Sequence, residues 1–166
     1  TSGSYNNFFG RATGQANTTG SHNQFFGRCA GGSNTCGGAN IFIGQRAGAS
    51  NTTGCNNISI GDNAGCANNG SKNILIGPYV GYYLTTGSCN VIIGEYAGSQ
   101  ALSNTVAINA GTCQRIKVND TGLYVNGSLL SGGGGGGASE AFKTIAVSGQ
   151  SDVVADSATD TLTLVA

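Results

Sequence analysis

A motif that recurs every 17 residues constrains the fold of this 166-residue chain more than any other feature of its sequence. Its clearest copy is NVIIGEYAG, which starts at Asn90, and the same frame returns upstream as NILIGPYVG, NISIGDNAG, NIFIGQRAG, NQFFGRCAG and NNFFGRATG. A fixed period of this length is typical of repeat architectures. One copy is a residue shorter, and the central glycines stand at Gly10, Gly27, Gly44, Gly61, Gly77 and Gly94.

Each motif contains a short strand. The residues one and three before the glycine are apolar, and this alternation indicates a strand with one buried face. The residue between them varies from Phe42 to Ser59 to Leu75, as expected of a face turned to solvent or to a neighbouring chain. We therefore expect a structural core column of Ile41, Ile43, Ile58, Ile60, Ile74, Ile76, Val91, Ile93, Val106 and Ile108.

Glycine and asparagine occupy fixed places in the unit. The central glycines are expected at turns with positive φ, which β-branched residues cannot adopt. Stacked coils repeat at about 4.8 Å, the spacing between strands. The asparagines that open the motifs would then form a ladder of side-chain amides bonded one to the next, namely Asn23, Asn40, Asn57, Asn73 and Asn90.

These features predict an all-β chain, a β-solenoid of β-roll or β-helix type. A single repeat cannot bury its apolar face alone, so its stability must come from the coils above and below it or from other chains. We expect the solenoid to be oligomeric. We assign residues 1–112 to the solenoid, 113–131 to a β-hairpin that closes it, 132–137 to a polyglycine linker and 138–166 to a C-terminal β segment. Because TSGSY at the start aligns with TTGSH at Thr18–His22, we expect the chain to be a piece of a longer protein.

Composition excludes several classes of partner. The formal net charge is zero and the chain has no basic cluster, so phosphate neutralisation and nucleic-acid binding are not expected. No apolar run approaches the roughly 20 residues of a membrane span. The 30 glycines and 8% charged residues are unlike an ordinary globular domain.

No catalytic residue, metal site or cofactor is predicted. His22 is the only histidine, and the GxxAG motif lacks the GK[ST] of a phosphate-binding loop, so both read as structural. The cysteines form no CxxC pair for zinc. Cys36 and Cys55 lie only two positions out of register in adjacent coils. They are therefore the pair that we consider for a disulfide.

The aromatic residues leave two interpretations open. Tyr79, Tyr82, Tyr83 and Tyr96 cluster in adjacent coils, and Phe8, Phe9, Phe25 and Phe26 fall in the first two. Packing or contact between chains is the main interpretation. A surface that stacks on host-surface carbohydrate is the alternative.

The repeat NxxIGxxAG with its TTG spacers resembles bacteriophage tail-fibre and virion-adhesin repeats. More distantly, it is similar to the head repeats of trimeric autotransporter adhesins, whose unit is shorter. The stretch VNDTGLYVNGSLLSGGGGGG, with the segment AFKTIAVSGQSDVVADSATDTLTLVA, is similar to segments of structural proteins of marine phages, cyanophages in particular. The resemblance implies a β-solenoid or β-roll, often trimeric, with a structural or adhesive role.

Our leading hypothesis is a non-enzymatic shaft segment of a tail fibre or adhesin, extracellular or on the virion surface. Its partner would be other copies of itself, in a homotrimer or a head-to-tail homopolymer. The alternative is a self-polymerising extracellular filament, joined by coil stacking or by strand addition from a tail that contains Leu162 and Leu164. A polysaccharide-cleaving enzyme would need clustered carboxylates, whereas the acidic residues are scattered.

Overall fold

The computed structural model describes residues 2–110, 113–119, 122–125, 128–130, 144–145 and 153–154. In these ranges the protein is all-β. Ten strands form one sheet, and strands that follow one another along the chain are neighbours in the sheet. A separate antiparallel pair joins β11 (Thr144–Ile145) to β12 (Val153–Val154). The described segments include no helix long and apolar enough to cross a bilayer.

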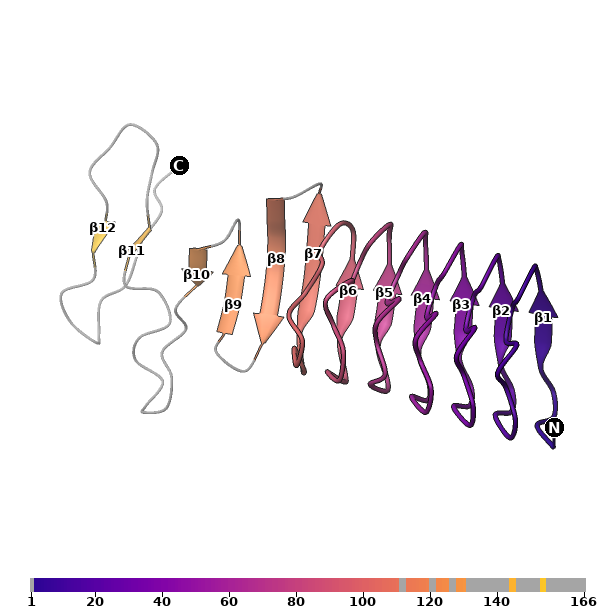
Figure 1. Cartoon of the computed structure of the whole chain (residues 1–166). Helices are drawn as coiled ribbons and strands as arrows, with labels where there is room; N and C mark the ends of the chain where they lie inside the picture. Colours follow the sequence, from indigo (N-terminus) through magenta and orange to yellow (C-terminus); the bar gives the residue numbers. More distant parts are fainter. Residues whose placement is uncertain are drawn as a thin grey trace.

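Strands β1 to β7 run parallel, one from each coil, and Figure 1 shows them side by side along the axis of a solenoid. Paired residues occupy the same position of the repeat, so Phe25 lies opposite Phe42, and Phe42 opposite Ser59. The β-solenoid of 17-residue repeats expected from the sequence is thus confirmed. The strands are β1 (Asn7–Phe9), β2 (Gln24–Phe26), β3 (Ile41–Ile43), β4 (Ile58–Ile60), β5 (Ile74–Ile76), β6 (Val91–Ile93) and β7 (Val106–Ala110).

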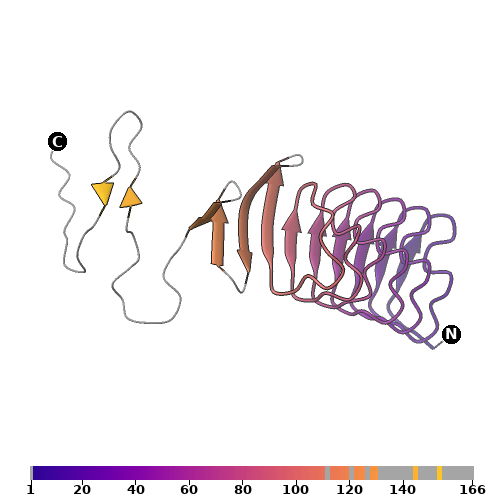
Figure 2. The ribbon, with the colours of Figure 1, turned by 60° about the vertical axis from the view of Figure 1, so that its left-hand side comes forward.

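The rest of each coil returns as a loop, and in Figure 2 these loops stack on one another beside the sheet. They are bonded as regularly as the strands. The Gly14 N–H donates to the carbonyl of Ala30 at 3.0 Å, and the Gly31 N–H donates to that of Ala47 at 3.0 Å. The ladder of backbone hydrogen bonds therefore continues around the coil, and neighbouring coils are held together on every side.

Two glycines in each coil make this path possible. Gly44 has φ of 133°, and a Cβ placed on it would collide with the carbonyl of Gly61 in the next coil. Gly48 has φ of 58°, and its Cβ would lie 2.5 Å from the ring of Phe42. The first glycine allows the close approach of successive turns, and the second leaves room for the side chain inside the coil.

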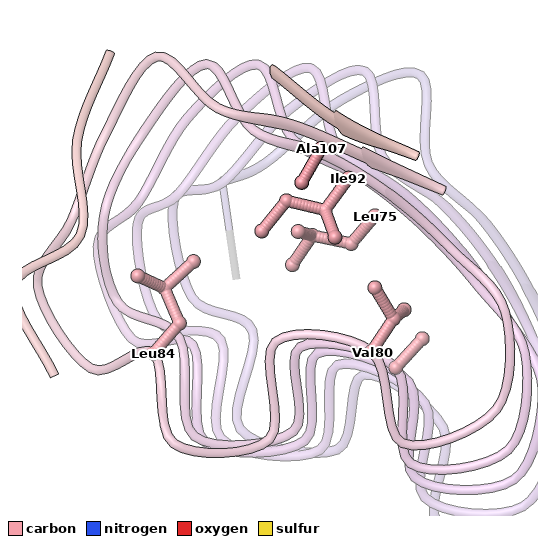
Figure 3. Close-up of a cluster of buried hydrophobic side chains, with 6 residues drawn as sticks. Leu75, Val80, Leu84, Ile92 and Ala107 are labelled. Carbon is pink, nitrogen blue, oxygen red and sulfur yellow. The ribbon is translucent and has the colours of Figure 1, made fainter. Parts of the chain in front are cut away.

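The hydrophobic core lies inside the coils and is built from the middle residue of each strand. Phe25, Phe42, Leu75 and Ile92 are at most 1% exposed, and Figure 3 shows Leu75, Ile92 and Ala107 pointing inward toward Val80 and Leu84. The core assignment from the sequence was therefore on the wrong face. The residues assigned to it are half-buried or exposed and point outward: Ile41, Ile43, Ile58, Ile60, Ile74, Ile76, Val91, Ile93, Val106 and Ile108.

The reason for the inversion is that most of these strands are apolar at all three positions. Alternation then marks two faces without saying which one is inside. The loop determines which face is inside, because Gly48 and the fully buried Ala47 leave a space into which the ring of Phe42 projects. Residues of the interior column vary in size, from Phe42 to Ser59, and beside Ser59 the loop glycine Gly65 lies close to Leu75 of the next coil.

Antiparallel strands extend the sheet beyond the solenoid. β7 pairs with β8 (Cys113–Asn119), β8 with β9 (Gly122–Val125), and β9 with β10 (Ser128–Leu130). Asn119 pairs with Gly122, which places the hairpin where the sequence predicts it. The polyglycine run 132–137 and the assembly-strand residues Leu162 and Leu164 lie outside the described residues.

Candidate interaction surface

The outward side of the sheet is an apolar face along the solenoid. Strands β3 to β6 each contribute two outward side chains, as Ile41 and Ile43 do in β3. The second of the pair is well exposed in β3, β5 and β6, with 40% of Ile43, 36% of Ile76 and 39% of Ile93 accessible, whereas in β4 it is half-buried. In β1 and β2 this second position is held by Phe9 and Phe26, which are also exposed.

The apolar face does not end with the last coil. Val106 and Ile108 of β7 lie opposite Val118 and Ile116 of β8, and Val118 lies opposite Leu123 of β9. All five side chains are 38–40% exposed. We use the name outward face for the surface formed by the outward side chains of β1 to β7 together with Ile116, Val118 and Leu123. Sequence reasoning missed it because it placed most of these residues in the core.

Asparagines bind one coil to the next inside the solenoid. The ladder expected from the sequence is fully buried, and its main link runs from side chain to backbone. The Asn57 N–H donates to Asn40 Oδ1 at 2.9 Å, while Asn40 Nδ2 donates to the carbonyl of Gly54 at 2.8 Å. Direct bonds between amide groups occur in this ladder from Asn73 to Asn57 at 3.2 Å and from Asn90 to Asn73 at 2.9 Å.

A second buried asparagine column, formed by the first residue of the NTTG spacer, was not predicted. Asn34 Nδ2 donates to Asn17 Oδ1 at 2.8 Å, and Asn51 Nδ2 donates to Asn34 Oδ1 at 3.0 Å. Each of these amides also donates to the carbonyl of the glycine that ends its own spacer, as Asn51 does to Gly54. The signal was the recurrence of NTTG at the same period as the main motif.

The shortened coil keeps the hydrogen-bond pattern through a side chain. In a full coil the carbonyl of Thr35 accepts from the N–H groups of Thr18 and Thr19 at 2.9 and 3.1 Å. The shortened coil has NNG in place of NTTG, and there Asn69 Oδ1 accepts from the N–H groups of Thr52 and Thr53 at 2.9 and 3.0 Å. A side-chain carbonyl thus replaces the missing backbone carbonyl.

Three tyrosines form an exposed aromatic cluster on the loops of the fifth coil. Tyr79 and Tyr82 have ring centroids 6.0 Å apart, and Tyr82 meets Tyr83 edge to face at 5.3 Å. Between 39% and 61% of each side chain is accessible. Tyr96 is half-buried and packs against the core cluster. Edge-to-face geometry presents ring edges as well as faces, so the three rings do not lie in one plane.

The disulfide considered from the sequence is not formed. Cys36 and Cys55 are both free thiols. Cys55 stands in a column of hydroxyl residues, and its Sγ accepts a hydrogen bond from the Gly38 N–H at 3.3 Å, as Ser71 Oγ does from the Cys55 N–H at 3.0 Å. The thiol is held against the neighbouring backbone, whereas Cys36 is exposed in the spacer turn. The pairing failed because proximity in the repeat does not fix side-chain direction.

Polar groups on this scaffold are distributed along columns rather than gathered in one place. His22 is exposed and its ring stacks on Tyr5 with centroids 4.9 Å apart. Among the residues that the structure describes, no three His, Cys, Asp or Glu side chains come together as metal ligands. Comparison of the chain with protein-family models, with curated proteins and with solved structures found no match.

Proposed function

We propose that this chain is a non-enzymatic structural protein, a shaft segment of a phage tail fibre or adhesin that works outside the cell or on the virion surface. The observation that carries the proposal is the linkage of every coil to the next by the same kinds of hydrogen bond. Backbone ladders run around the coil, and buried asparagines such as Asn40 tie the coils together from inside. The resemblance of the NxxIGxxAG repeat to tail-fibre repeats supports the same assignment.

The mechanism is mechanical. Each coil advances the rod by about 4.8 Å, the spacing between strands. A load along the axis is shared by all the hydrogen bonds between two coils, so none breaks alone. Proteases need a locally unfolded segment of chain, and a backbone bonded around the coil opens only when neighbouring coils open too. A stiff, protease-resistant spacer follows from this arrangement.

The non-enzymatic part of the proposal is supported by the placement of the acidic groups. Asp62 and Glu95 occupy equivalent positions two coils apart, which separates them by roughly 10 Å along the axis. Hydrolysis of a glycosidic bond by two carboxylates needs them to flank one bond from opposite sides. A column along one edge of a solenoid does not provide that geometry.

Electron microscopy of the purified chain in dilute solution, with mass per unit length measured on the same particles, tests the proposal. We expect straight rods that survive limited proteolysis. Compact particles, or rapid digestion across residues 2–110, would contradict it. Incubation with bacterial surface polysaccharides is the second arm, and release of new reducing ends would overturn the non-enzymatic assignment.

A further inference from the structure

We infer that the outward face of the sheet binds the outward face of a second copy of this chain, with the two solenoids parallel. The inference deepens the proposed fibre function by naming the lateral partner of the solenoid. It rests on that proposal in taking the rod to contain more than one chain. The observation behind it is the continuous apolar surface from Phe9 in β1 to Leu123 in β9.

The face is as large as the apolar patches that often serve a function on soluble proteins. With strands about 4.8 Å apart and about 3.3 Å per residue, it covers roughly 40 Å by 10 Å, on the order of 400 Å² in projection. The largest apolar patch on a typical soluble monomer is about 300–600 Å² and is often functional. Here the patch is flat and repeats with the period of the strands, as an interface built coil by coil would.

The chemistry of the face excludes a charged ligand. The outward side chains of β1 to β7 are Phe, Ile, Val or Ala, apart from Asn7 and Gln24 at one end. A partner must therefore be apolar and flat. It buries the most apolar surface if its side chains repeat every 4.8 Å over the same length. The same face of a second copy meets all three conditions, because its apolar side chains have the same spacing over the same length.

The two edges of the face carry different groups. One edge is formed by the residues that follow the turn glycines, where charge changes along the axis from Arg11 and Arg28 to Asp62 and Glu95. The other edge is formed by the residues that precede the motif asparagines, namely Tyr5, His22, Ala39, Asn56, Lys72 and Cys89. The basic end of the first edge lies level with the stacked rings of Tyr5 and His22 on the second.

These edges are complementary when the second copy is turned by a half-turn about the solenoid axis. That rotation keeps each coil at its own level and places one edge against the other. Lys72, just before β5, then lies between the levels of Asp62 after β4 and Glu95 after β6. Arg28 faces the aromatic pair, a favourable partner for a guanidinium group. An antiparallel partner, turned about the centre of the face in β5, would instead bring the Lys72 side chains of the two copies to the same level.

The first test is the oligomeric state of the full chain by sedimentation equilibrium, compared with the single-chain mass of 16.4 kDa. We expect the wild type to assemble and Ile76→Lys, at the centre of the face, to weaken assembly at least about 100-fold, because it buries a charge against apolar groups. Thr86→Lys is the matched control, since Thr86 is exposed on the spacer turn, and it should assemble as the wild type does.

Ile76→Thr keeps a β-branched residue in the strand, so it provides the readout if the lysine variant does not fold. Its assembly should weaken about tenfold with an unchanged circular-dichroism spectrum. A monomeric wild type at 100 µM, or a folded Ile76→Lys variant that assembles normally, would overturn the inference. A monomeric wild type that floats with phosphatidylcholine vesicles would overturn it too, by showing lipid to be the occupant.

A charge exchange tests the parallel arrangement. Lys72→Glu should weaken assembly a few-fold, as expected of ion pairs at the rim of an interface, and the combination with Asp62→Lys and Glu95→Lys should restore it. No restoration would rule out the proposed orientation. Electron microscopy separates this inference from the proposed function. Rods with the mass per unit length of one chain would refute the interface and support the fibre. Compact oligomers that Ile76→Lys disrupts would support the interface and refute the fibre.

Discussion

The ring of Phe25 stacks on the ring of Phe42 in the next coil, with centroids 4.8 Å apart and an angle of 8° between the ring planes. Phe8 continues the stack on the other side, at 4.9 Å and 9°. These separations equal the spacing of hydrogen-bonded strands, so the backbone ladder sets the distance between the rings. The stack therefore links the interior of three successive coils in the N-terminal half of the solenoid.

We expect Phe25→Ala to lower the free energy of unfolding by about 3–5 kcal/mol. Phe25 is fully buried between two rings, and its removal leaves a cavity that the hydrogen-bonded coils cannot close. Chemical denaturation followed by circular dichroism measures the effect. Tyr83→Ala, at a side chain that is 61% exposed, is the control and should cost much less. Equal losses in the two variants would contradict the assignment of the core to the inward side of the sheet.

Asn40→Ala tests the inner ladder. The substitution leaves the buried N–H of Asn57 without its partner, and such an orphaned group costs about 1–3 kcal/mol. The carbonyl of Gly54 loses one of two donors and keeps Asn51 Nδ2. We expect a loss of about 2 kcal/mol and faster hydrogen exchange at the Asn57 amide. Gln45→Ala changes an exposed side chain of the same coil and should be neutral. An Asn57 amide that exchanges as slowly as before would argue against the ladder.

The sequence was sufficient to predict the solenoid, its period, the turn glycines and the hairpin after the last coil, because all of them depend on backbone geometry that repeats. It was not sufficient to choose between the two faces of a strand such as Ile41–Ile43, in which every residue is apolar. That choice depends on what the loop presents to the strand, here Ala47 and Gly48.

Roles that depend on the direction in which a side chain points could not be predicted from the sequence either. The replacement of a backbone carbonyl by Asn69 Oδ1 follows from the shortened coil, which the sequence displays, but the bond itself requires the turn geometry. Cys36 and Cys55 were placed close together by the repeat, yet Cys55 Sγ is bonded to the backbone of the neighbouring coil. Spacing predicted which residues are neighbours, and only the fold determines which of them touch.

Ser59→Ala should stabilise the solenoid. Ser59 occupies the interior column between Phe42 and Leu75, it is 1% exposed, and its hydroxyl oxygen has no hydrogen-bond partner. Removing an unsatisfied buried hydroxyl relieves a desolvation cost, so we expect a gain of about 1 kcal/mol. Thermal unfolding provides the measurement, with Ser33→Ala at an exposed loop position as the control. A fall in melting temperature for Ser59→Ala would mean that the hydroxyl is solvated within the fold.

Because of Cys66, the stability of the solenoid should depend on pH in the alkaline range. Burial raises the pKa of this thiol above its ordinary value of 9.0, against the opposing effect of the Arg46 charge. The pKa of the thiol is lower in the unfolded chain than in the folded protein. The stabilisation from burying the neutral thiol is therefore complete below about pH 9, and it is lost as the pH rises through the pKa that Cys66 has in the folded protein.

We therefore expect the free energy of unfolding to fall more steeply above about pH 9 in the wild type than in Cys66→Ala, which lacks the thiol. The difference between the two proteins isolates Cys66 from the tyrosines and the other cysteines, which both proteins share. Alkylation by iodoacetamide gives an independent readout at a single pH. Cys66 should react far more slowly than the exposed Cys36 in the folded protein and at a similar rate in denaturant, because the thiolate is the reactive form. Equal rates in the folded protein would place Cys66 at the surface and remove the reason for the pH dependence.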